Sequence, residues 1–144
     1  MEANLIITDG SGVEKGDTSN PVYVIDNPAK HTATTITVSW AKDSATSAEI
    51  DTLGYTTHGI LIPDSFDGAT LSFLTSTISG GTFRSLYSSD GTEVTVTSVA
   101  TNRMISFDTI KDELTPWQYV EIRSGSAATI AEQAATVTTY LVSR

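Results

Sequence analysis

The sequence predicts an all-β protein: a two-sheet antiparallel sandwich, jelly-roll-like, with an extended N-terminal β arm. Polar and apolar residues alternate in short stretches, as in strands that have one buried face and one exposed face. Turn residues, among them the pairs Asp67-Gly68 and Asp90-Gly91, separate these stretches at intervals of about 8 to 12 residues. Thr and Ser fill 41 of the 144 positions, and the branched Cβ of Thr favours strands.

About ten stretches show this alternation. Few windows have the spacing of an amphipathic helix. We expect Asp108 to cap a single helical turn that Pro116 ends. Residues 126–136 can form a loop or a short helix, and we favour the loop. The expected strands cover residues 5–9, 21–26, 35–40, 58–63, 69–76, 82–88, 93–98, 103–107, 117–124 and 136–143.

The same alternation assigns one face of each strand to the core. Successive side chains of a strand point to opposite sides, so apolar residues two apart in the sequence share a face. The predicted core consists of Ile36, Val38, Trp40, Leu71, Phe73, Val94, Val96, Ile105, Phe107, Val120, Ile122, Val137, Thr139 and Leu141.

Residues 1–30 differ from residues 31–144, which we expect to form the sandwich domain. The N-terminal segment has two apolar stretches around a polar, glycine-containing connection, and it ends in Asn27-Pro28. It can complete a sheet of its own fold, or it can be an arm that adds to an edge of a neighbouring subunit. The sequence leaves both possibilities open. In the second case the contacts between subunits would come from Leu5, Ile7, Val22 and Val24.

Composition excludes several classes of function. The chain has no Cys, so disulfides and thiolate metal sites are excluded, which suits a reducing cytoplasm. The net charge is -9, and the 8 basic residues are scattered. Phosphate binding needs clustered Lys and Arg, so we expect neither nucleic acid nor a membrane as a partner. The acidic N-terminus and the lack of a long apolar run predict a soluble chain without a signal peptide.

No motif for catalysis or for a cofactor is present. The histidines, His31 and His58, lie outside any nucleophile motif. Residues 9–20 fail as a calcium-binding EF-hand loop, because Glu14 stands where Gly is needed and Asn20 where Glu is needed. We therefore predict a protein that is not an enzyme, with no catalytic, metal-binding or cofactor-binding residues.

The aromatic residues of the stretch 117–124 are a candidate for binding. Trp117 and Tyr119 share one face of this expected strand with Glu121 and Arg123, opposite the predicted core positions. Neighbouring aromatic rings on an outer face are favoured at interfaces. We therefore name Trp117 and Tyr119 as candidate interaction residues; a covering loop would explain them equally well.

A longer pattern resembles a small β-sandwich domain of tailed-bacteriophage virion proteins. It comprises an apolar strand before Pro63, "GATLSFLTS", the aromatic-rich "FRSLYSSDGTEVTV", "YVEIRSGS", and an Ala-Gln-Ala stretch before the last strand, over about residues 50 to 144. The opening "LIITDGSG", followed by "PVYVID", is similar to the start of phage structural proteins encoded near the major capsid gene.

The resemblance implies a capsid decoration (cement) protein or a related accessory virion component, which has no catalytic residues to carry over. The expected partners are the major capsid protein and the chain itself as a homo-oligomer. The expected location is the capsid exterior, after synthesis in the host cytoplasm. The second hypothesis is a tail- or fibre-associated module that binds host surface carbohydrate, and the third is a hydrolase with an unrecognised site.

Overall fold

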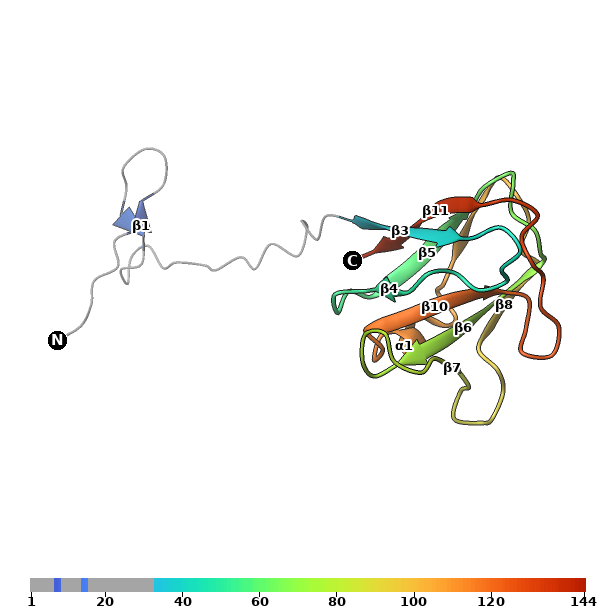
Figure 1. Cartoon of the computed structure of the whole chain (residues 1–144). Helices are drawn as coiled ribbons and strands as arrows, with labels where there is room; N and C mark the ends of the chain where they lie inside the picture. The colour runs from blue at the N-terminus through green and yellow to red at the C-terminus, as the bar shows by residue number, and fades with distance from the viewer. Residues whose placement is uncertain (1–6, 9–13, 16–32) are drawn as a thin grey trace. The chain divides into compact units, whose positions relative to one another are not determined.

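The computed structural model describes residues 7–8, 14–15 and 33–144 (Figure 1). The chain divides into two units, residues 1–31 and 32–144. In the first unit, β1 (Ile7–Thr8) and β2 (Glu14–Lys15) pair in antiparallel fashion, with Ile7 opposite Lys15. β2 lies within the stretch that we expected to be a connection. Leu5, Val22, Val24 and the expected strand 21–26 lie outside the described residues.

The second unit is a sandwich of two antiparallel sheets. The four-stranded sheet has the order β3-β11-β5-β9, and the five-stranded sheet has the order β4-β10-β6-β7, with β8 also paired to β6. Figure 1 shows β3, β11 and β5 in one layer and β10, β6 and β7 in the other. The strands are β3 (Thr34–Trp40), β4 (Ile50–Asp51), β5 (Thr57–Ile62), β6 (Thr70–Ser76), β7 (Arg84–Ser85), β8 (Thr95–Thr97), β9 (Arg103–Ser106), β10 (Tyr119–Ser124) and β11 (Val137–Ser143).

The strands pair as if a long antiparallel ribbon had been wound up. β3 pairs with β11, β4 with β10, β5 with β9, and β6 with β7 and β8. Winding the ribbon then brings β11 against β5 and β10 against β6. This is the strand order of a jelly roll, so the predicted sandwich is confirmed.

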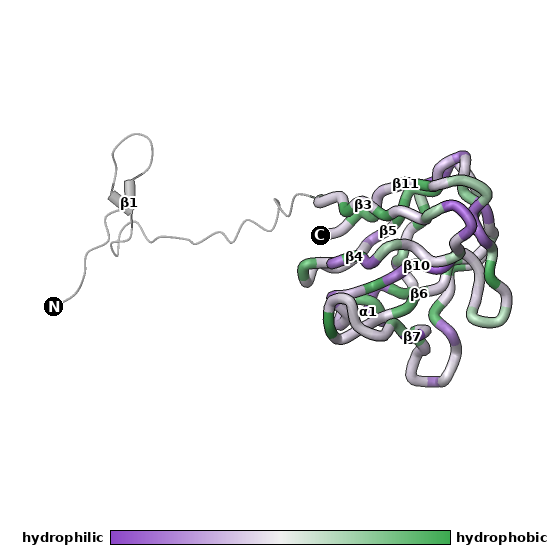
Figure 2. The backbone as a smooth tube through the Cα atoms, in the orientation of Figure 1, coloured by the Kyte–Doolittle hydropathy of each residue, from purple (hydrophilic) through white to green (hydrophobic). Residues whose placement is uncertain are grey.

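The core lies between the two sheets. Figure 2 shows green, apolar positions alternating with paler or purple ones along the strands of the sandwich. Every predicted core residue is buried, except that Ile36, Val96 and Ile105 are partly buried and pack against the core. Trp40 fills the centre: its Nε1 donates a 3.0 Å hydrogen bond to the carbonyl of Ile122, across the two sheets. The alternation therefore predicted the core face of each strand correctly.

The only helix in the part of the chain that the structure describes is α1 (Lys111–Leu114), a single turn before Pro116. The predicted turn is confirmed, but its predicted cap is wrong. The N-cap position is Ile110, without a side-chain cap. Asp108 lies two residues earlier and instead accepts a 2.9 Å hydrogen bond from Lys111 Nζ. Residues 126–136 form a loop, as favoured.

Candidate binding surfaces

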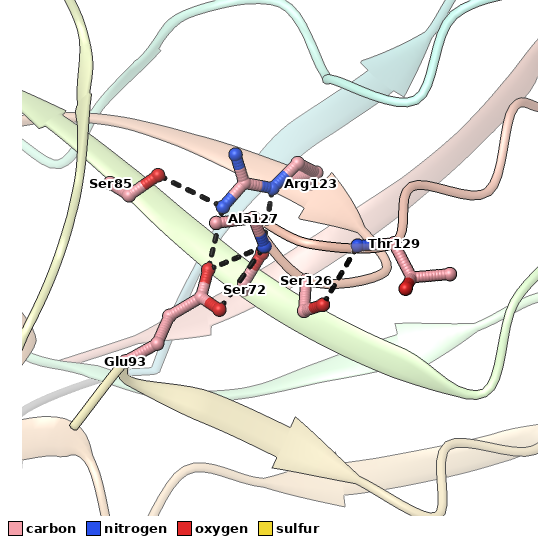
Figure 3. A network of polar contacts seen from close by, with 7 residues as sticks. All are labelled: Ser72, Ser85, Glu93, Arg123, Ser126, Ala127 and Thr129. Atoms are coloured by element: carbon pink, nitrogen blue, oxygen red, sulfur yellow. Dashed lines mark hydrogen bonds and ion pairs between the residues drawn. The ribbon is translucent and has the colours of Figure 1, made fainter.

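The outer face of the five-stranded sheet carries a buried ion pair (Figure 3). The β10–β6 register places Arg123 opposite Ser72, and Arg123 Nε donates to Ser72 Oγ at 2.9 Å. A second guanidinium nitrogen donates to Ser85 Oγ at 3.0 Å and to Glu93 Oε1 at 2.6 Å. The Glu93 carboxylate also accepts the backbone N–H of Ala127 at 2.9 Å. The two charged side chains are only 10% and 15% exposed.

Glu93 reaches Arg123 because a hairpin interrupts the edge of this sheet. β7 pairs with β6 through Ser85 opposite Leu74, and β8 resumes on the same edge with Thr95 opposite Ser72. Between β7 and β8 the chain leaves the sheet edge as a hairpin, in which Tyr87 and Glu93 form an antiparallel β-bridge. We call this outer face, together with the hairpin 87–94 and the loop 125–130 that pack on it, the loop-covered face. The ion pair clamps both segments to the sheet.

A groove lies beside the same edge, around Trp117. Two adjoining hollows of about 410 and 300 Å³ share Leu86, Tyr87 and Trp117 in their walls. Arg84 lines the larger hollow, and Asp112 and Glu113 line the smaller. Tyr87 is 52% exposed, whereas Trp117 is half-buried and packs against the core. We call this feature the Trp117 groove; its aromatic walls flanked by charge suit a polar ligand with flat apolar surfaces.

The structure separates the two aromatic residues singled out in the sequence. β10 begins at Tyr119, and Trp117 lies before it, in a turn where its N–H donates to the Leu114 carbonyl. Tyr119 lies opposite Asp51 and Ser76 and lines neither hollow. The aromatic partner of Trp117 in the groove is Tyr87 instead. The alternation of 117–124 grouped Trp117 with Tyr119 because it assumed that the strand began at residue 117.

The strand residues on the outer face of the four-stranded sheet carry no charge, unlike those of the loop-covered face. In one row, Thr35, Val142, Gly59 and Ser106 lie side by side across all four strands. In the next row, Thr37 lies opposite Tyr140 and Leu61 lies opposite Met104. Tyr140 is 49% and Met104 61% exposed, and no described loop packs over them. We call this surface the bare face; its residues, none of them charged, are Thr35, Thr37, Ser39, Gly59, Leu61, Met104, Ser106, Thr138, Tyr140 and Val142.

Three carboxyl groups in the part of the chain that the structure describes have shifted pKa values. Burial raises the pKa of Glu121, and the nearby Glu49 carboxylate raises it further. Hydrogen bonds lower the pKa of Asp108, from Lys111, and of Asp90, from Ser88. These carboxyl groups belong to three segments of the chain: Glu121 to β10, Asp108 to the segment before α1, and Asp90 to the hairpin 87–94.

Comparison of the chain with protein-family models, with curated proteins and with solved structures finds no match. Among residues 7–8, 14–15 and 33–144, no group of three or more His, Cys, Asp or Glu side chains could hold a metal ion. No helix of these described residues is long and apolar enough to cross a membrane. His31 lies outside the described residues, and His58 belongs to β5.

Proposed function

We propose that this chain is a non-enzymatic structural protein of a tailed-phage virion, a head decoration (cement) protein that binds the capsid lattice. The composition of the bare face supports the idea that this chain binds another protein. In a chain with net charge -9, ten residues spread over four strands carry no charge, and exposed Tyr140 and Met104 lie among them. Depletion of charge together with exposed aromatic and Met side chains is typical of the centre of a protein interface.

The phage part of the proposal rests on the resemblance of residues 50–144 to virion β-sandwich domains. A jelly roll suits such a part, because it presents rigid outer faces while its core needs no ligand. Each copy would bind weakly, and repetition over a symmetric shell would turn weak contacts into high avidity. The N-terminal arm residues Leu5, Ile7, Val22 and Val24 would add a second set of contacts to neighbouring subunits.

The test is binding of the purified chain to phage heads that lack it. We expect saturable co-sedimentation with the heads, and cryo-microscopy should locate the chain on the capsid exterior. Tyr140→Lys and Met104→Lys each place a charge on the bare face and should weaken binding at least tenfold. Tyr87→Ala changes the Trp117 groove only and should bind as the wild type does.

Two results would contradict the proposal. The first is no binding of the wild type to heads at concentrations up to about 100 μM, beyond which even repeated weak contacts would be too weak to hold. The second is binding that Tyr140→Lys and Met104→Lys leave unchanged. Deletion of residues 1–25 tests the arm separately: it should reduce head binding while the sandwich keeps its thermal unfolding transition.

The Trp117 groove favours a second candidate function, recognition of host surface carbohydrate by a tail- or fibre-associated module. Sugars stack their apolar ring faces on aromatic side chains and hydrogen-bond to charged groups at the rim, and Trp117, Tyr87 and Arg84 offer both. Titration with host polysaccharide decides between the two functions. Saturable binding that Trp117→Ala abolishes would support the module, whereas a cement protein should bind no sugar in this assay.

A further inference from the structure

The strand β3 forms one edge of the four-stranded sheet, and the described residues cover only part of this edge. At its C-terminal end, Trp40 bridges to Ser47, and the Ala48 N–H donates a 2.8 Å hydrogen bond to the Ser39 carbonyl. The segment 45–48 therefore closes this end of the edge. Residues 34–38 have no strand beside them on that side among the described residues.

The direction of the backbone groups follows from the same hydrogen bond. The Ser39 carbonyl points away from β11, and alternate residues of an antiparallel strand direct their N–H and C=O groups to the same side. Thr35 and Thr37 therefore point both groups outward from the sheet edge. Both residues are exposed, and no described residue accepts from or donates to these outward groups. These unpaired N–H and C=O groups can form backbone hydrogen bonds with another strand.

The other edges of the sandwich are protected, and this one is not. Natural edge strands are kept apart by charge, by shortness or by interruption. β9 carries Arg103, β4 is two residues long and contains Asp51, and the β7–β8 edge carries Arg84 and is interrupted by the hairpin. Residues 34–38 of β3, "TTITV", contain no charge, no Pro and no bulge against β11.

We propose that residues 34–38 pair with the same residues of a second copy, in antiparallel fashion about a two-fold axis. The lack of charge along this edge suits a second copy as the occupant. Two chains with net charge -9 repel one another, so an edge that pairs with itself must set no like charges side by side. This edge meets that condition, and adding one strand to another joins the two four-stranded sheets into one continuous sheet.

The closed end of the edge determines the register. Because Ser39 and Trp40 already pair with the segment 45–48, an incoming strand can use only residues 34–38. Antiparallel pairing about Ile36 then sets Thr35 opposite Thr37 of the second copy, and each such pair exchanges its outward N–H and C=O groups. Ile36 meets its own counterpart, which covers the part of this side chain that the core leaves exposed.

The interface is small, so the association should be weak and should depend on concentration, with half-association between about 10 μM and 1 mM. The inference does not depend on the proposed function, because it concerns the isolated chain. Self-association and head binding are measured separately, and either can fail without the other.

Sedimentation velocity of the full chain over this concentration range is the test. We expect a shift from the 15.3 kDa monomer towards a dimer as concentration rises. Thr37→Pro removes only an outward N–H, so the variant should stay monomeric while its thermal unfolding midpoint falls by no more than about 5 °C. Thr37→Val keeps the N–H and should associate as the wild type does.

A pair of double variants tests the register. With Thr35 opposite Thr37 of the second copy, T35K/T37K sets lysines against lysines and should abolish the dimer. T35K/T37E sets each lysine against a glutamate and should restore it at least to the wild-type level. A chain that is monomeric throughout the range, a dimer that survives Thr37→Pro, or double variants that behave alike would each overturn the proposal. So would loss of the dimer on deletion of residues 1–25, because the N-terminal segment would then be the occupant of the edge.

Discussion

The loop-covered face and the bare face are the two outer surfaces of the same sandwich, and their chemistry is opposite. The loop-covered face holds the buried Arg123–Glu93 pair, with each charged group hydrogen-bonded to its neighbours. The bare face has no charged side chain, and it exposes Tyr140 and Met104. The buried ion pair therefore orders the protein's own loops on one face, and the other face carries no charge.

The difference shows that the most conspicuous polar cluster here is structural. The Arg123 guanidinium donates to two hydroxyls and one carboxylate, and that carboxylate also accepts the Ala127 N–H. These contacts hold the hairpin 87–94 and the loop 125–130 to the sheet. No described loop covers the bare face. Its exposed apolar groups are therefore accessible to a partner.

The largest expected effect is on the loop-covered face. Glu93→Ala leaves the Arg123 guanidinium buried with hydroxyl partners only, and it should lower the free energy of unfolding by about 3 to 5 kcal/mol, the usual result of breaking a buried ion pair. Urea denaturation followed by circular dichroism measures this change.

A double variant and a bare-face variant serve as controls in the same assay. E93L/R123M removes both charges and should lie within about 1 kcal/mol of the wild type, because apolar side chains of similar volume can replace a buried pair. Tyr140→Thr on the bare face should change the stability by less than about 0.5 kcal/mol. Equal costs for Glu93→Ala and Tyr140→Thr would remove the distinction between the two faces.

The sequence predicted most strands of the loop-covered face, but neither β4 nor the Arg123–Glu93 ion pair. We expected strands at residues 82–88, 93–98 and 117–124, and we expected Arg123 on an outer face together with Tyr119. Alternation is a local property, so it predicts faces and core residues well. The Arg123–Glu93 contact joins residues 30 apart, and it depends on a hairpin that interrupts an edge strand, which alternation does not reveal.

The candidate site shows the same limit. Trp117 was predicted as an interaction residue, and the structure places it in the wall of a groove. Its partner there, Tyr87, comes from the hairpin and could be found only from how the strands pair. The signal available in the sequence was the Asp90-Gly91 turn, which favours a hairpin just after Tyr87.

The second prediction concerns the flatness of the bare face. Gly59 lies in the row of Thr35, Val142 and Ser106, and a Cβ at this position would lie 2.5 Å from the Ile105 carbonyl oxygen. Gly59→Ala should therefore force β5 and β9 apart and lower the stability by about 1 to 3 kcal/mol, as overpacking does. Thr35→Ala, in the same row, should change it by less than about 0.5 kcal/mol. If both variants unfold at the same urea concentration, β9 is free to move and the bare face is not a rigid surface.

The smallest expected effect returns to the five-stranded sheet, where Glu121 lies on the outer face opposite Leu74. Burial, with a further contribution from Glu49, raises the pKa of Glu121 above its ordinary value of 4.5. The folded protein therefore holds this proton more tightly than the unfolded chain does. Stability due to this group is present below pH 4.5 and is lost as the pH rises through the raised folded pKa.

It follows that Glu121→Gln, which keeps the shape and removes the charge, should be slightly more stable than the wild type at pH 7. The difference should disappear at about pH 3.5, where both states of the wild type hold the proton. As a control for the amide substitution itself, Glu132→Gln, at an exposed loop position, should change the stability at pH 7 by less than about 0.5 kcal/mol. A Glu121→Gln variant that is less stable than the wild type at pH 7 would mean that this carboxylate, like Glu93, has a stabilising partner. The loop-covered face would then be held by charge at a second point.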